Sequence, residues 1–143
     1  MGVEGACPRA GHFRLACVAA LLVVTPLGFA FKYYQGPLHH WFNDYGAGVL
    51  YEVFWVVLGT MVFSPARPSW KVPAVVFAVT CALEFLQLWH PAFLETLRAT
   101  FLGRALLGTT FVWLDFPHYV LGCALGYLLL LALASATATV GRP

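Results

Sequence analysis

The sequence predicts an all-α fold: an integral membrane four-helix bundle with a short interfacial helix between the third and fourth spans. Hydrophobic residues make up 61% of the 143 positions and charged residues only 10%, whereas a typical soluble domain has about 25% charged residues. Four apolar stretches also have roughly the 17–25 residues needed to cross a ~30 Å hydrocarbon core. We therefore expect a single transmembrane domain, 1–143, with spans at about 13–34, 45–63, 72–89 and 113–134.

Aromatic residues support the boundaries of these spans in order along the chain. Tyr and Trp side chains settle at the membrane–water interface, and the predicted span ends carry Tyr33, Tyr34, Trp41, Trp70, Trp89 and Trp113. The apolar runs between them contain few charges, as a transmembrane helix requires. The aromatic pattern therefore agrees with the four spans.

The connection from His90 to Thr110 is too polar to span and too apolar to lie free in water. Leu94, Leu97, Phe101 and Ala105 recur at helical spacing, with Glu95 and Arg98 together on the opposite side. This pattern predicts a short amphipathic helix in the outer interface. A buried re-entrant segment is the alternative.

Lysine and arginine in the short loops set the expected orientation, because cytoplasmic loops are enriched in both. One side holds five such residues, Arg9, Arg14, Arg67, Lys71 and Arg142, and the other side holds three, Lys32, Arg98 and Arg104. We therefore expect both termini in the cytoplasm. The net charge of +2 is small and scattered, so no nucleic-acid partner is expected.

Polar residues inside or beside the spans are the main indication of function. A charge at mid-membrane costs ~2.5–3.5 kcal/mol on insertion scales, so each one needs a compensating role. All of them fall in the outer half of the expected bundle. The candidate ligand-binding cluster comprises Asn43, Asp44, Glu52, Glu84, Gln87, Arg104, Asp115 and Tyr119.

Spacing relates several members of this cluster. Glu84 and Gln87 are three apart and share a helix face, while Asp44 and Asp115 stand at the expected starts of the second and fourth helices. Arg104 is the expected counter-ion of Glu84 and Asp115, because a guanidinium holds two carboxylates and keeps its proton when buried. The purely structural alternative is that these groups form interhelical hydrogen bonds or helix N-caps.

Gly122 and Gly126 form a small-xxx-small motif that predicts close packing on a neighbouring helix, and we expect that neighbour to be the third span. The histidines show no metal-site spacing, so we expect no metal, and His118 is a weak candidate ligand for a pigment. No serine lies near the polar cluster. We therefore assign no catalytic residue, and a role other than an enzyme is favoured over an enzymatic one.

These residues resemble the VanZ-like membrane proteins. The shared positions are Asn43–Asp44, Gly48, Glu84-x-x-Gln87, Arg104, and Asp115 with Tyr119, Gly122 and Gly126. Within that group, the chain is most similar to an uncharacterised bacterial family of small inner-membrane proteins, domain of unknown function number 2809. The resemblance implies a bacterial cytoplasmic (inner) or intracytoplasmic membrane. Tyr45 and Gly46 replace the Lys and His often found in VanZ, so antibiotic resistance is not implied.

Three functions remain open. The first is an outer-leaflet polar site that binds a membrane lipid headgroup or a cell-envelope precursor, with no cofactor. The second is an accessory or structural subunit of a larger photosynthetic or respiratory membrane complex, where a chlorophyll-type pigment would be the cofactor. The third is a membrane enzyme acting on a lipid-linked substrate through Glu84 or Asp115.

Overall fold

The computed structural model describes residues 8–63 and 67–140, and every regular element in these residues is helical. The elements are α1 (Pro8–Lys32), α2 (His39–Trp41), the π-helical turn η1 (Phe42–Gly46), α3 (Ala47–Phe63), α4 (Lys71–Leu86), α5 (Ala92–Arg98), α6 (Phe101–Leu107) and α7 (Asp115–Val140). The prediction of an all-α chain is confirmed. Arg142 lies outside the described residues.

Three helical stretches are long and apolar enough to cross a membrane: Gly11–Lys32, His39–Phe63 and Asp115–Ala138. Large apolar side chains such as Leu22 on α1 and Leu128 on α7 are exposed on the outside of these helices. Extensive apolar surface of this kind suits contact with lipid. The chain is therefore a membrane protein, with α4 as a shorter helix of 16 residues.

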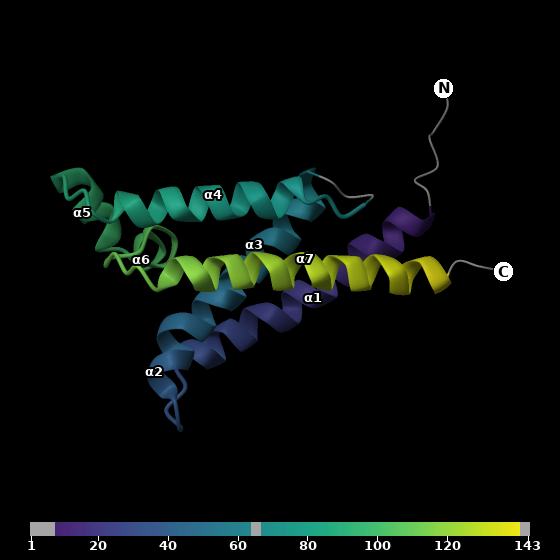
Figure 1. Cartoon of the computed structure of the whole chain (residues 1–143), viewed down its shortest axis with the longest axis horizontal. Helices are drawn as coiled ribbons and strands as arrows, with labels where there is room; N and C mark the ends of the chain where they lie inside the picture. The colour runs from purple at the N-terminus through teal and green to yellow at the C-terminus, as the bar shows by residue number, and fades with distance from the viewer. Residues whose placement is uncertain (1–7, 64–66, 141–143) are drawn as a thin grey trace.

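Helices α3 and α7 form the centre of the molecule, because each contacts the other and both contact α1 and α4. In Figure 1, α4 and α7 run side by side, and α1 and α3 cross them at an angle. α2, α5 and α6 lie at one end of these long helices, and α1 begins and α7 finishes at the other end. The core is built from small and branched side chains, including Val53, Val56 and Val57 of α3 and Leu130 of α7.

Gly122 and Gly126 allow α7 to approach α3 closely. A Cβ atom at Gly122 would lie 2.5 Å from Glu52 Cβ, and one at Gly126 would lie 2.9 Å from Val56 Cβ. The expected close packing is present, but its partner is α3, in the expected second span, and not α4, the expected third span. The same face of α7 carries Cys123 and Leu130, which join the core and thereby turn both glycines toward α3.

The second long helix starts earlier than hydropathy suggested. It begins at His39, directly after Leu38, whose φ of 60° ends the preceding turn. Asp44 lies inside η1 and is exposed, so it does not cap the start of a helix. Hydropathy marks where a chain becomes apolar, whereas backbone hydrogen bonding decides where its helix begins.

The connection between α4 and α7 contains two short helices, where the sequence predicted one. Thr100 begins the second of them, α6, because its hydroxyl oxygen accepts a hydrogen bond from Gly103 N at 3.0 Å. Leu94 and Arg98 are the buried residues of α5, while Leu97 and Phe101 are exposed. Arg98 was expected on the side opposite Leu94, and this placement is wrong, since α5 presents Leu94 and Arg98 together to the bundle.

Candidate functional site

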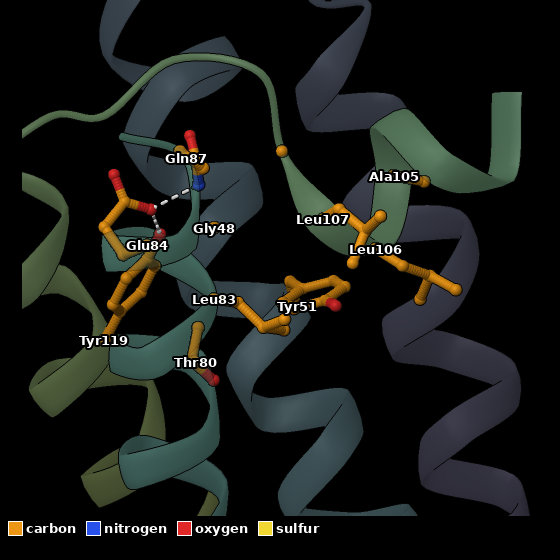
Figure 2. Close-up of a pocket in the computed structure, with 11 residues that line it drawn as sticks. Gly48, Tyr51, Thr80, Leu83, Glu84, Gln87, Ala105, Leu106, Leu107 and Tyr119 are labelled. Carbon is orange, nitrogen blue, oxygen red and sulfur yellow. Dashed lines mark hydrogen bonds between the residues drawn. The ribbon is translucent and has the colours of Figure 1, made fainter. Parts of the chain in front are cut away.

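The carboxyl group of Glu84, near the end of α4, is the centre of a buried polar site. The residue is only 1% exposed. Its Oε2 accepts hydrogen bonds from Gln87 Nε2 and from the Tyr119 hydroxyl of α7, both at 2.8 Å. Its Oε1 accepts the backbone N–H of Val112 at 2.8 Å. Figure 2 shows Gln87 and Tyr119 converging on this carboxyl group. Three neutral donors thus join α4, α7 and the segment before α7.

Arg104 is not the counter-ion of this carboxyl group. Its side chain is exposed, and its Nη2 lies 3.4 Å from the backbone oxygen of Ala99. Over residues 8–63 and 67–140, the ion pairs join Glu95 to His90 and to Arg98. The expected pairing of Arg104 with Glu84 and Asp115 is therefore wrong. The donors that replace it include a backbone N–H, which the side-chain pattern does not reveal.

Arg98 holds the buried position expected for Arg104 and is 4% exposed. Its Nη2 donates to Leu86 O at 2.8 Å and its Nη1 donates to Trp89 O at 3.0 Å. Nη1 also lies 2.8 Å from Glu95 Oε1. The guanidinium therefore binds backbone carbonyls at the C-terminal end of α4. Hydrogen bonds with His90 and Arg98 lower the pKa of the Glu95 carboxyl from its usual value.

A polar pocket of about 130 Å³ lies against this site. It is lined by Gly48, Tyr51, Thr80, Leu83, Glu84, Gln87, Ala105, Leu106, Leu107, Gly108 and Tyr119. In Figure 2, Glu84, Gln87 and Tyr119 stand on one side and Leu106 and Leu107 on the other. The pocket therefore has a polar wall from α4 and α7 and an apolar wall from α6.

An apolar groove of about 470 Å³ adjoins the polar pocket. Its lining is Tyr51, Trp55, Leu58, Gly59, Val62, Phe63, Val75, Val76, Val79, Thr80, Leu83, Leu106 and Leu107. The two spaces share Tyr51, Thr80, Leu83, Leu106 and Leu107. The groove therefore extends from the polar pocket along α3 and α4, with α6 at their common boundary.

Gly108 closes the chain over the polar pocket. Its φ of 66° is a left-handed conformation that favours glycine. A Cβ atom there would lie 2.4 Å from Gln87 Nε2. Only a residue without a side chain lets the backbone after α6 pass so close to the Gln87 amide.

The remaining polar candidates lie around this centre rather than in it. Glu52 is fully buried, and its Oε2 accepts from Cys123 Sγ at 3.2 Å, while its Oε1 has no partner among the described residues. Asp115 is half-buried and interacts electrostatically with Glu84 and Asp44. The backbone oxygen of Asn43 accepts from Lys32 Nζ at 3.2 Å. Glu84, Gln87 and Tyr119 are thus the candidates that share direct hydrogen bonds.

His118 lies at the edge of this region. Its Nδ1 is 2.7 Å from the backbone oxygen of Leu114, which makes Nδ1 the protonated nitrogen, and its ring stacks on Tyr45 with centroids 4.4 Å apart. In the described part of the chain, no group of three or more His, Cys, Asp or Glu side chains is placed to hold a metal ion.

Four residues of this region were not among the site residues expected from the sequence: Tyr51, Thr80, Arg98 and Gly108. Thr80 lies four residues before Glu84, hence on the same face of α4, and this spacing was a usable signal. Tyr51 precedes the buried Glu52, but no helical spacing relates it to Glu84, Gln87 or Tyr119 in the sequence. The position of Gly108 depends on a chain reversal that only the folded backbone shows.

Comparison with known proteins gives a family but no activity. No curated protein and no solved structure matches this chain, and the resemblance to VanZ stays an expectation. Residues 37–123 match the family described as "Protein of unknown function (DUF2809)". The matched range contains all the lining residues of the polar pocket and covers more than half of the chain. The chain therefore belongs to this family of proteins of unknown function.

Proposed function

We propose that this protein binds an amphiphile, either a membrane lipid or a lipid-linked cell-envelope precursor, with its head group in the polar pocket and an acyl chain in the apolar groove. The observation that supports this most is the shared boundary of the two spaces at Tyr51, Thr80 and Leu83. A polar chamber that opens into an apolar groove matches the two halves of a lipid. Binding sites commonly combine an apolar lining with a few convergent polar groups.

The same proposal includes α4 as a fourth span and places both termini in the cytoplasm. At ~1.5 Å per residue, α4 is about 24 Å long, and α5 and α6 extend the structure beyond its end. The excess of Lys and Arg at the end where α1 begins supports this orientation. The polar pocket then lies in the outer leaflet, and the groove runs from it toward the middle of the bilayer.

An accessory role in a larger membrane complex is the second candidate. The observation in its favour is a cluster of contacting aromatic rings, Phe85, Phe111, Trp113 and Phe116, at the start of α7. Trp113 is 70% exposed, so it is available to a partner or a pigment. In that role, His118 would use Nε2 as ligand, because Nδ1 donates to Leu114 O.

Purification from native membranes in mild detergent, without crosslinking, tests the first candidate. Native mass spectrometry of the wild-type protein should show a retained lipid. Leu83→Trp should lose that lipid, because the larger side chain fills the boundary between pocket and groove. Leu88→Trp is the matched control, since Leu88 is exposed and lines neither space.

Two outcomes would contradict the lipid proposal. One is a wild-type protein without bound lipid, and the other is equal lipid retention by both tryptophan variants. Comigration of the wild-type protein with a much larger assembly, without a retained lipid, would support the accessory role instead.

A further inference from the structure

We infer that the polar pocket accepts a head group that carries hydroxyl or amine donors and no negative charge, and that it excludes phosphate. This inference rests on the proposed amphiphile binding, because it names the chemical class of the head group. It follows from the charges of the pocket lining and from the directions of its hydrogen bonds.

The charge on the pocket wall is the first argument. Neither the pocket nor the groove has a lysine or arginine in its lining, and Glu84 contributes a carboxyl group to the pocket. Arg98, the buried arginine beyond the end of α4, is already bound to Leu86 O, Trp89 O and Glu95. Two like charges about 8 Å apart at an effective dielectric constant near 20 repel enough to weaken binding more than ten-fold. A phosphate would meet this repulsion without a compensating cation.

The hydrogen-bond directions are the second argument. Backbone N–H groups are a common anion-binding feature of proteins, but the N–H of Val112, in the segment before α7, already donates to Glu84 Oε1. The Tyr119 hydroxyl and Gln87 Nε2 also donate to this carboxyl group. The protein's own carboxylate therefore occupies the place that an anionic ligand would need.

Oxygen acceptors are still available in the pocket lining. The Thr80 hydroxyl donates to Val76 O at 2.8 Å, so its oxygen remains an acceptor. The Tyr51 hydroxyl also belongs to the lining and can accept as well as donate. A head group with O–H or N–H donors matches these groups.

Trp55 supplies a direct assay, because it lines the groove. A dibrominated diacylglycerol bound there should quench wild-type fluorescence more than that of Trp55→Phe, and this difference reports the occupied groove. Unlabelled dioleoylglycerol, oleylamine and dioleoylphosphatidic acid are then added as competitors. Dioleoylglycerol or oleylamine should relieve the quenching, and their ranking separates a hydroxyl from an ammonium. Phosphatidic acid should compete at least about ten-fold more weakly.

The variant Glu84→Gln keeps the shape of the side chain and removes its charge, so it should strengthen competition by phosphatidic acid. Glu95→Gln is the control and should leave the competition by all three lipids unchanged.

Equal competition by phosphatidic acid and dioleoylglycerol in the wild-type protein would overturn the head-group inference but leave amphiphile binding intact. No difference in quenching between wild type and Trp55→Phe would overturn the proposed function itself. If Glu84→Gln fails to fold, the relative competition by phosphatidic acid and dioleoylglycerol in the wild-type protein still tests the head-group inference.

Discussion

Arg98 stabilises the end of α4, where Leu86 O has no partner inside the helix and otherwise accepts only the N–H of Trp89, at 3.1 Å, from the segment beyond it. The last carbonyls of any α-helix are in this position, and in α4 the Arg98 guanidinium binds Leu86 O while also reaching Trp89 O. Because the guanidinium is planar and has several N–H donors, one side chain satisfies both oxygens. α5 is thereby fixed to the end of α4.

The first prediction concerns the two arginines of this connection. Arg98→Ala should lower the free energy of unfolding by about 2–3 kcal/mol, because hydrogen bonds from a charged group to buried carbonyls are lost. Arg98→Lys should recover little, since a point-like ammonium does not reproduce the planar fork. Arg104→Ala, the matched control, should change stability by less than about 0.5 kcal/mol. Thermal unfolding in detergent measures all three, and equal effects of the two alanine substitutions would contradict the assigned roles.

At the residue scale, side-chain spacing predicted part of the site. Glu84 and Gln87 were placed together because residues three apart share a helix face, and Tyr119 was already among the candidates. The partner of Glu84 Oε1 is Val112 N, and every residue except proline has such an N–H. No residue type signals which backbone group will meet a carboxylate, so this contact was not predictable.

Among the elements, the contact between α3 and α7 depends most on a missing side chain. At Gly122, a Cβ atom would lie 2.7 Å from the backbone oxygen of Val49 as well as close to Glu52. Backbone atoms of a packed helix cannot move aside as a flexible side chain does. The distance between α3 and α7 is therefore set by this glycine.

The second prediction follows from that contact. Gly122→Ala should destabilise the protein by about 1–3 kcal/mol through overpacking, although alanine favours a helix over glycine by about 1 kcal/mol. Gly48→Ala has open space around its Cβ and should be neutral or stabilising. Unfolding of both variants under the same conditions gives the comparison. A Gly122→Ala protein as stable as Gly48→Ala would show that the helices separate without cost.

Hydropathy predicted the long helices better than the segments between them. α1, α3 and α7 follow the apolar runs because burial in lipid requires such runs. The two short helices α5 and α6 did not follow from pattern, since Leu94, Leu97 and Phe101 keep helical spacing across the break at Thr100. The break is produced by the hydrogen bond from Gly103 N to Thr100 Oγ1. Hydrophobic periodicity does not indicate a single side-chain–backbone hydrogen bond of this kind.

For the whole molecule, the third prediction tests the proposed orientation. In a cysteine-free background, His40→Cys in α2 should react with a membrane-impermeant thiol reagent in intact cells, because α2 lies at the end proposed to be outside. Ser69→Cys, just before α4, should react only after permeabilisation. Labelling with the reverse pattern would invert the orientation, and labelling of both positions in intact cells would contradict a bundle in which α3 crosses the membrane.

The shared end of α1 and α7 has a consequence for covalent assembly. α1 begins and α7 finishes at the same end of the molecule (Figure 1), and the two helices are in contact. With α4 as the proposed fourth span, two copies joined head to tail by a short linker would insert with identical polarity, and neither copy would be inverted. A gene duplication of this chain would create a tandem protein whose two pockets face the same compartment. No additional transmembrane helix would be needed to restore the orientation of the second copy.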